Sequence, residues 1–248
     1  SKGIGKNIAE GLAARGYDLL LVARSENGLS DLARQLEASH KVKVHFLAVD
    51  LSDLNSGKKV FDWVSSLSIR ISVLVNNAGF GLGGSLESAQ PDELHSLMQV
   101  NMLTPVALTR LFIGQLKQEN PSYILNIAST AAYQSVPYLN VYAASKAFML
   151  SFSRGLRHEL RGSRVSVTCI CPGPTDTHFV DRAGLGEKPR KMASRFNMKP
   201  EEVAEQSIRA MINKKAEVVP GVVNKLNRFF AWLLPKSILE SSAASIYE

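Results

Sequence analysis

Short apolar runs alternate with longer amphipathic segments along nearly all of the 248 residues. Runs of strand length occupy residues 17–23, 42–49, 71–76, 123–128, 165–171 and 217–219. Apolar residues recur with helical spacing over residues 4–15, 29–38, 57–67, 91–116, 141–160 and 201–212. Strands that are apolar on both faces and alternate with helices are typical of a parallel sheet covered on each side. The pattern predicts an α/β fold, a single doubly wound, Rossmann-type domain over residues 1–248, with ligands bound at the carboxyl ends of the strands.

The chain opens directly on a glycine turn and a helix, with no strand pattern before them. In a doubly wound sheet, the strand that leads into such a turn lies in the middle. Without it, the two neighbouring strands keep unpaired backbone groups. We therefore expect the first strand of the fold to lie upstream of the printed sequence, within roughly ten residues. A targeting or anchoring segment upstream stays an open alternative.

The net charge of +7 raises the question of nucleic-acid or membrane partners. The basic residues, however, are dispersed among acids, as in the stretch from Arg154 to Arg161, which also contains Glu159. This pattern is typical of a solvated surface, and we expect no nucleic-acid partner. No run of eighteen apolar residues occurs, so the sequence predicts no membrane-spanning helix.

The two cysteines, Cys169 and Cys171, lie two residues apart in the strand-like run 165–171. Their side chains share one face of that strand, but a second pair of zinc ligands is missing and the five histidines are scattered. We interpret them as buried thiols in a reducing compartment, and we expect a cytoplasmic protein without a metal site.

The glycine turn at the start suits a pyrophosphate. Glycines permit close backbone approach, and the helix that follows offers free N–H groups and a positive dipole end. The turn consists of Lys2, Gly3, Ile4 and Gly5. Arg24 follows the strand at residues 17–23, where folds that choose NAD often place an acid for the ribose 2′-hydroxyl. Two cations and no acid predict NADP(H), with a plain surface role for Arg24 as the alternative.

A phenol and an ammonium lie four residues apart on one helical face, at Tyr142 and Lys146. Thirteen residues before Tyr142, Ser129 ends the strand 123–128, where its hydroxyl would stand over the ligand cleft. A nearby ammonium favours the phenolate, so we expect Lys146 to lower the pKa of Tyr142. With six tyrosines in the chain, a chance spacing is the alternative, and the pair with Ser129 indicates proton transfer by the tyrosine.

Asn101 lies four residues before Pro105 in the predicted helix 91–116. Proline has no N–H, so the Asn101 carbonyl loses its intrahelical donor and becomes available to a water or a lysine. A simple proline kink is the alternative.

The glycine-rich run 79–84 follows another strand, and no helix pattern begins directly after it. We interpret this run as a flexible loop near the substrate.

Two further motifs lie where a doubly wound sheet binds its ligand. The motif Asn76-Asn77-Ala78-Gly79 ends the strand 71–76, and the Pro172-Gly173 turn follows the strand 165–171. Turn formation alone is the simpler explanation of each motif taken singly.

Taken in order, these motifs resemble the short-chain dehydrogenase/reductase family over essentially the whole chain. The family's threonine and first glycine of the pyrophosphate turn are absent here. The resemblance implies a catalytic tetrad of Asn101, Ser129, Tyr142 and Lys146. It also implies cofactor contacts from Asp50, Leu51, Asn76, Asn77, Pro172, Gly173, Thr175 and Thr177, besides the glycine turn and Arg24. In this mechanism Tyr142 protonates a carbonyl oxygen as hydride arrives from NADPH, and the Asn101 carbonyl positions a water.

We therefore expect an NADPH-dependent reductase, or reverse alcohol dehydrogenase, of a ketone or aldehyde. A substrate loop is expected over residues 173–198, and a weaker resemblance to reductases of fatty-acyl and steroid ketones indicates an apolar or acyl-linked substrate. A non-catalytic NADP-binding sensor or scaffold, and an NAD-linked enzyme that oxidises alcohols, remain alternatives. By the same resemblance, helices 91–116 and 141–160 pair across a twofold axis, giving a homodimer or homotetramer.

Residues 222–248 form a predicted helical tail. Its apolar residues recur at helical spacing through Val222, Val223, Leu226, Phe229, Phe230 and Leu233. We interpret this stripe as core, packed on the sheet or roofing the substrate pocket. Lys225, Arg228 and Lys236 keep a membrane-surface contact over residues 222–236 as the alternative.

Overall fold

The computed structural model describes residues 2–175, 179, 183–188, 190–191 and 197–247. The strands and helices predicted from the sequence are present, with ends shifted by a few residues. The strands are β1 (Leu19–Ala23), β2 (Val44–Ala48), β3 (Val73–Asn76), β4 (Ser122–Ile127), β5 (Val165–Ile170) and β6 (Glu217–Val218). The main helices are α1 (Gly3–Ala13), α2 (Glu26–His40), α3 (Ser56–Ser66), α4 (Pro91–Met98), α5 (Thr104–Leu116), α6 (Asn140–Glu159), α9 (Pro200–Ile212), α10 (Val222–Leu233) and α11 (Lys236–Tyr247).

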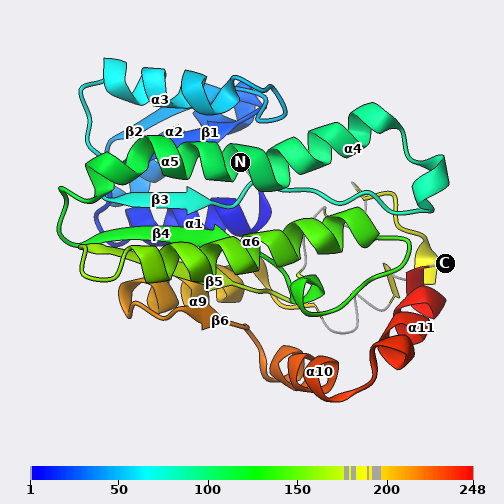
Figure 1. The fold of residues 1–248 in the computed structure, drawn as a ribbon. Helices are drawn as coiled ribbons and strands as arrows, with labels where there is room; N and C mark the ends of the chain where they lie inside the picture. The colour runs from blue at the N-terminus through cyan, green and yellow to red at the C-terminus, as the bar shows by residue number, and fades with distance from the viewer. Residues whose placement is uncertain (1, 176–178, 180–182, 189, 192–196, 248) are drawn as a thin grey trace.

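All the strand pairs are parallel, as the alternation of strands and helices predicts (Figure 1). The described strands form a two-stranded sheet, β1–β2, and a four-stranded sheet in the order β3–β4–β5–β6. Within the larger sheet, β4 and β5 are buried at every position. The carboxyl ends of the strands therefore meet at one edge, where the fold class places its ligand.

A cavity of about 800 Å³ lies between the two sheets. Its walls include Leu20 and Val22 of β1, Val73 and Val75 of β3, and Ile8 of α1. Within the described residues, β1 and β3 line this cavity but do not pair with each other, so the parallel strands form two separate sheets.

Helices cover both faces of the sheet. On one face, α1, α2 and α9 contribute Ile8, Leu36 and Ile208 to an apolar cluster that also contains residues of β1, β4 and β5. On the other, α3, α5 and α6 contribute Val60, Phe112 and other residues against the opposite side of the same strands. This arrangement of layers confirms the predicted Rossmann-type fold (Figure 1).

The predicted continuous helix 91–116 is interrupted by a π-helical turn, η2 (Gln99–Leu103). Pro105 explains the interruption, because it lacks the N–H that would bond the Asn101 carbonyl and its ring pushes that carbonyl aside. By length and composition alone, the run Pro91–Leu116 could cross a membrane. Leu97, Phe112 and Leu116 are nevertheless buried in apolar clusters of the fold, as in a core helix.

The interpretation of the tail as core is wrong for α10. The six apolar residues of its predicted stripe expose between 48% and 73% of their surface, whereas the buried residues of the helix are Asn224 and Ala231. The physical reason is that the polar side of α10 contacts the rest of the protein, through Asn224 against Gly173 and through the ion pair of Arg228 with Glu217. Helix α11 does pack inward, through Ala243 and Tyr247, and Figure 1 shows both helices at the edge of the molecule beyond β6.

Candidate active site

The four residues predicted as a catalytic tetrad come together at the carboxyl edge of the sheet. Ser129 follows β4, Tyr142 and Lys146 lie in the first turns of α6, and Asn101 lies in η2. The Ser129 hydroxyl forms a hydrogen bond with the Tyr142 phenol, and the Lys146 Nζ lies 5.6 Å from the centre of the Tyr142 ring. A Cβ built on Gly79 would lie 3.1 Å from that Nζ and 3.2 Å from the Asn101 Oδ1, so only glycine leaves this space open.

Tyr142 is a buried phenol whose proton is held tightly. Burial raises the pKa of Tyr142 to about 12, the hydrogen bond with Ser129 lowers it, and the neighbouring Tyr247 raises it. The expectation that Lys146 lowers the pKa of Tyr142 is therefore wrong for this arrangement, because desolvation of the phenolate outweighs the attractive contributions. The phenol is protonated at neutral pH.

Lys146 is a buried lysine that is anchored at the end of β4. Its Nζ donates a hydrogen bond to the Ile127 carbonyl over 3.1 Å, which directs the ammonium towards the strand end. Burial lowers the pKa of Lys146 to about 8, while the thiols of Cys169 and Cys171 act in the opposite direction. Both cysteines are buried, as the sequence predicts.

Asn101 ties the π-helical turn to the glycine-rich loop and to α6. Its Oδ1 accepts a hydrogen bond from the Phe80 N–H over 3.1 Å, and its Nδ2 donates to the Phe80 carbonyl over 2.9 Å. The same Nδ2 donates to the Ser145 Oγ over 3.0 Å, and that hydroxyl donates to the Tyr142 carbonyl. The side chain thus positions the loop beside Lys146, a contact that the sequence analysis did not foresee.

The glycine turn leads directly into α1. Gly3 has a φ of 57°, in the left-handed region that favours glycine, and Lys2 is the exposed residue that precedes the helix. A Cβ built on Gly5 would clash with the Asn77 Nδ2, so any larger residue would displace the Asn77 side chain. The free N–H groups at the start of α1 can therefore be approached closely by a phosphate, as the motif predicts.

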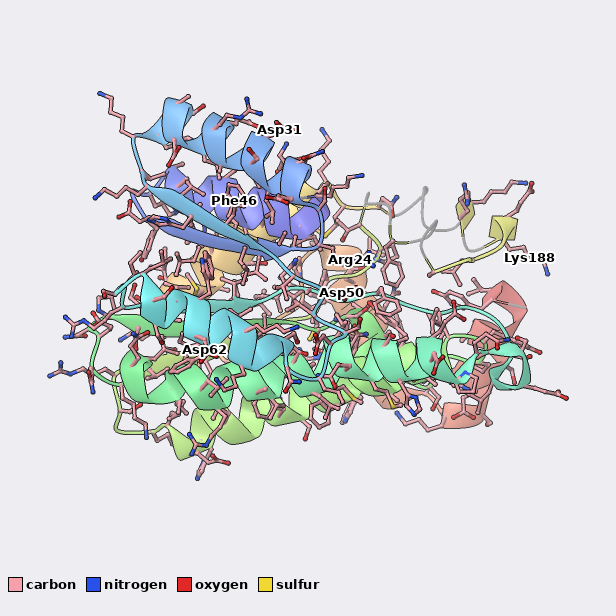
Figure 2. The ribbon with its side chains drawn as sticks, turned by 90° about the horizontal axis from the view of Figure 1, so that it is seen from above. Arg24, Asp31, Phe46, Asp50, Asp62 and Lys188 are labelled. Atoms are coloured by element: carbon pink, nitrogen blue, oxygen red, sulfur yellow. The ribbon has the colours of Figure 1, made fainter. Side chains whose placement is uncertain are left out.

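Arg24 and Asp50 lie at the ends of two paired strands. Because Ala23 of β1 pairs in register with Ala48 of β2, the residues that follow them reach the same edge of the sheet, as Figure 2 shows. Arg24 is exposed there. The Asp50 Oδ1 accepts hydrogen bonds from the N–H and the hydroxyl of Ser52, which orders this loop.

Neighbouring predicted cofactor residues are held by the surrounding helices and strands. The Leu51 carbonyl accepts a hydrogen bond from the Thr104 hydroxyl over 2.9 Å. The Asn76 Nδ2 donates to the Asn126 Oδ1 over 2.8 Å inside the sheet, and the Asn126 Nδ2 donates to the Ser153 Oγ. Asn126 is not among the residues predicted from the sequence, although a polar residue in the otherwise apolar strand 123–128 is a signal that could have indicated it.

The loop after β5 lies beside Ser129. The Pro172 carbonyl accepts a hydrogen bond from the Thr130 N–H over 2.8 Å, and the Thr175 Oγ1 donates to the Gly173 carbonyl. Gly173 has no room for a side chain because Asn224 of α10 packs against it. Thr177, the last predicted residue of this loop, lies outside the described residues.

An apolar cluster surrounds Tyr142. The ring centres of Phe179 and Tyr142 lie 5.0 Å apart, and Phe80, Leu82 and Tyr247 pack in the same cluster. The glycine-rich loop is bonded to the same cluster, because the Gly83 N–H donates a hydrogen bond to the carbonyl of Ala183, a member of the cluster. Tyr247 was missed from the sequence, because nothing in the spacing of α11 indicates that it returns to the site.

A Rossmann-type sheet that gathers a hydroxyl, a phenol and an ammonium at its ligand-binding edge defines a nicotinamide-dependent oxidoreductase that acts on CH–OH or C=O groups. The chain belongs to the short-chain dehydrogenase family, whose model, described as "short chain dehydrogenase", matches residues 1–188.

Known members of the family are similar over most of the chain. A ketoacyl reductase, HetN, from Nostoc sp. is 29% identical over 88% of this chain and 75% of its own length. Very-long-chain 3-oxoacyl-CoA reductase-A from Danio rerio is 33% identical over 68% of this chain, which corresponds to 54% of that protein. A solved short-chain dehydrogenase from Sphingobium yanoikuyae, in complex with NADPH, is 28% identical with a TM-score of 0.81, covering 89% of this chain and 84% of its own.

Proposed function

We propose that this protein reduces an apolar ketone, of the 3-oxoacyl class, with NADPH as the hydride donor and Tyr142 as the proton donor. The observation that carries this proposal is the state of the Tyr142 phenol. It is buried, hydrogen-bonded to Ser129, and protonated at neutral pH because its pKa is raised to about 12. A protonated phenol supplies a proton to a reacting oxygen, which is what reduction requires.

The residues present fit a dinucleotide. The start of α1 offers backbone N–H groups behind Gly3, and the space in front of Gly79 is bordered by Lys146 and Asn101 and would be filled by any side chain. In our proposal, Asp50 and Leu51 contact the adenine side, Asn76 and Asn77 support the ribose, and Pro172, Gly173, Thr175 and Thr177 line the nicotinamide side. When bound, the nicotinamide supplies the hydride.

The protein's own side chains donate the proton that the reaction requires and restore it afterwards. The Tyr142 hydroxyl gives its proton to the carbonyl oxygen of the substrate, and the Ser129 hydroxyl stabilises the charge that develops on that oxygen. Lys146, fixed by the Ile127 carbonyl, binds the ribose next to the nicotinamide. The carbonyl of Asn101, freed by Pro105, holds a water through which the tyrosine regains its proton.

NADP(H) is the proposed cofactor because both cations of the predicted phosphate site occupy suitable positions. Arg24 is exposed at the end of β1, and Lys2 precedes α1 on the same edge of the sheet. The NADPH in the Sphingobium yanoikuyae relative supports the choice. A guanidinium beside the adenine ribose favours a 2′-phosphate over a 2′-hydroxyl.

The proposed substrate class rests on the apolar cluster around Tyr142. Phe80, Leu82, Phe179, Leu185 and Tyr247 pack in this cluster, beside the phenol that would meet the ketone. Apolar surface of this kind binds an acyl chain rather than a sugar or a small charged acid. Two relatives whose names include ketoacyl or 3-oxoacyl reductase support the same class.

A homo-oligomer is part of the proposal. The outward sides of α5 and α6 would pair with the same helices of a second copy, where Leu103, just before α5, and Phe148 of α6 are exposed. Two large apolar side chains on neighbouring elements are compatible with a twofold contact. Light scattering at micromolar concentration measures the state directly, and a monomer would contradict this part.

The test is the consumption of NADPH with a panel of carbonyl compounds. We expect turnover with long-chain 3-oxoacyl thioesters to exceed turnover with short hydrophilic ketones. A protein that binds NADPH but reduces none of the panel would instead support the non-catalytic sensor or scaffold role.

The cofactor preference is tested by binding. The affinity for NADPH should exceed that for NADH at least tenfold, or about 1.4 kcal/mol. Arg24→Ala should shrink this preference, whereas the control Arg34→Ala, at an exposed residue of α2, should leave it unchanged.

A further inference from the structure

Helix α10 is amphipathic, but its polar side faces the protein. The Asn224 Nδ2 donates a hydrogen bond to the Pro220 carbonyl over 2.8 Å, and the side chain packs against Gly173. One turn further, Arg228 forms an ion pair with Glu217 over 2.8 Å and stacks over the Tyr133 ring. Because residues 224, 228 and 231 share one side of a helix, the apolar residues of α10 occupy the opposite side.

The outward side of α10 carries a continuous set of large apolar residues. Trp232 is 77% exposed, and its ring centre lies 6.1 Å from that of Phe229, which in turn lies 5.9 Å from that of Phe230. The set continues into α11 with the exposed Ile238. We call this surface the α10 apolar face; it consists of Val222, Val223, Leu226, Phe229, Phe230, Trp232, Leu233, Leu234 and Ile238. Exposed apolar residues gathered in this way mark a site of interaction with a protein, a membrane or a ligand.

The charge beside the α10 apolar face is positive. No aspartate or glutamate occurs between residues 218 and 239, while Lys225, Arg228 and Lys236 do. A pocket of about 760 Å³ opens at the rim of the face, and Lys225, Lys236 and Trp232 are among its described lining residues. The described carboxylate in this lining, Glu217, is already bonded by Arg154 over 2.7 Å and by Arg228. The Lys236 Nζ donates a hydrogen bond to the Ala231 carbonyl over 3.2 Å, and the described residues of the rim carry more positive than negative charges.

We propose that the α10 apolar face docks on the surface of an anionic phospholipid bilayer. The apolar residues enter the boundary between headgroups and acyl chains, Trp232 lies at the headgroup level, and Lys225 and Lys236 contact phosphates at the rim pocket. This combination of an apolar side, a basic margin and an interfacial tryptophan is the physical signature of a helix that lies in the membrane surface. With twelve residues, α10 is about 18 Å long, too short to span the hydrocarbon core.

Charge complementarity favours the bilayer over a second copy of this chain. In a twofold contact, the same face would meet itself, and residues 218–239 would bring Lys225 and Lys236 of both copies together without a carboxylate from that stretch. An anionic bilayer neutralises those cations instead. The proposal does not depend on the reaction catalysed at the site.

Vesicle flotation tests this inference. The protein is mixed with vesicles of phosphatidylcholine alone, or of phosphatidylcholine with phosphatidylglycerol, and the floated fraction is measured. We expect the unmodified protein to bind the anionic vesicles at least tenfold more tightly than the neutral ones. Phe229→Ser combined with Phe230→Ser should weaken binding to the anionic vesicles at least tenfold. Lys225→Glu combined with Lys236→Glu should abolish the preference for anionic lipid.

Matched controls remove equivalent side chains elsewhere. Leu54→Ser replaces an exposed leucine just before α3, which Figure 1 shows on the opposite side of the molecule from α10, and Lys117→Glu reverses an exposed lysine after α5. Neither control should change flotation. Circular dichroism checks that each variant is folded; if the serine variant unfolds, the lysine variant decides.

Three results would overturn the proposal. The unmodified protein could fail to float with anionic vesicles, or the serine and glutamate variants could float as well as the unmodified protein. Alternatively, light scattering could show a dimer that Phe229→Ser with Phe230→Ser dissociates, which would assign the face to a second copy. NADPH turnover with a ketone in solution is measured in parallel, so that loss of the reaction is distinguished from loss of docking.

Discussion

Helices α6 and α10 are both predicted from apolar residues at helical spacing, yet they lie in opposite environments. Helix α6 buries Met149 and Leu156 against the sheet and directs Tyr142 and Lys146 into the site. Helix α10 buries a polar residue, Asn224, and exposes its apolar side. The difference shows that periodicity defines the face of a helix, whereas the position of the helix in the chain decides what covers that face.

The chain order explains the contrast. Helix α6 connects β4 to β5, two adjacent parallel strands, so the crossover must return across the sheet and bury one side of the helix. Helix α10 follows β6, the last strand in the order of its sheet, and the described residues after α10 form a helix rather than a strand that would return to the sheet. Its orientation is fixed instead by the ion pair between Arg228 and Glu217 and by the packing of Asn224 on Gly173.

The largest expected effect is on the turnover number, when the proposed proton donor of α6 is removed. Tyr142→Phe keeps the ring and its packing but removes the proton donor. General acid catalysis contributes 10²–10⁴-fold, or roughly 3–5 kcal/mol of barrier, so kcat should fall by that factor. NADPH affinity, measured by fluorescence titration, should stay close to that of the unmodified protein, because Lys146 and the glycine turn remain. Turnover above about a tenth of the unmodified rate would contradict the role of Tyr142.

The second largest effect is on the free energy of unfolding, when a buried side chain of α6 is shortened. Met149 is 2% exposed, and Met149→Ala leaves a cavity that its neighbours fill only in part. Substitutions of this kind lower the free energy of unfolding by about 2–5 kcal/mol, which urea unfolding followed by circular dichroism would detect. A loss below about 1 kcal/mol would show that α6 is less tightly packed than the structure indicates, and the contrast with α10 would weaken.

A smaller effect comes from the buried charge of Lys146. Its pKa is about 8 in the folded protein and 10.5 in the unfolded chain, because burial disfavours the ammonium. Between pH 8 and 10 the unfolded chain binds a proton that the folded protein has released, so the free energy of unfolding should rise with pH by on the order of 2 kcal/mol from this group. Above pH 10 the raised pKa of Tyr142 acts in the opposite direction, since the unfolded chain then loses a proton that the folded protein retains.

Urea unfolding at pH 8, 9 and 10 measures this rise, and Lys146→Met is the reference that isolates it from the other titrating groups. The unmodified protein should gain stability relative to the variant across the window. Parallel changes in the two proteins would mean that the lysine is solvated rather than buried at the end of α6.

Much of the fold and of the site could be predicted from the sequence, because each depends on local signals. The strands and helices follow from hydrophobic periodicity. The meeting of Ser129, Tyr142 and Lys146 follows from a strand end and one helical turn. The pKa of Tyr142 could not be predicted in the same way, because it depends on how deeply the whole fold buries the phenol.

The remaining features depend on contacts between distant segments. Tyr247 lies more than a hundred residues from Tyr142 in sequence but packs in the same cluster, and no local pattern of α11 indicates this. Asn126 and Ser153 likewise form a buried hydrogen bond between β4 and α6. The outward orientation of α10 depends on Glu217, whose partners Arg154 and Arg228 come from two different helices.

The smallest expected effect makes the sharpest test of the comparison. Leu226 lies in the middle of α10 and is 53% exposed, so Leu226→Ser removes apolar surface that is already in water. Substitutions at such positions change the free energy of unfolding by no more than about 0.5 kcal/mol, compared with several kcal/mol for Met149→Ala. Urea unfolding of the two variants side by side, in solution without lipid, gives the contrast directly. If Leu226→Ser destabilised the protein by more than about 1 kcal/mol, its side chain would be packed against the body. The apolar side of α10 would then be part of the core, as the sequence alone predicts, and its surface would no longer be available to a bilayer.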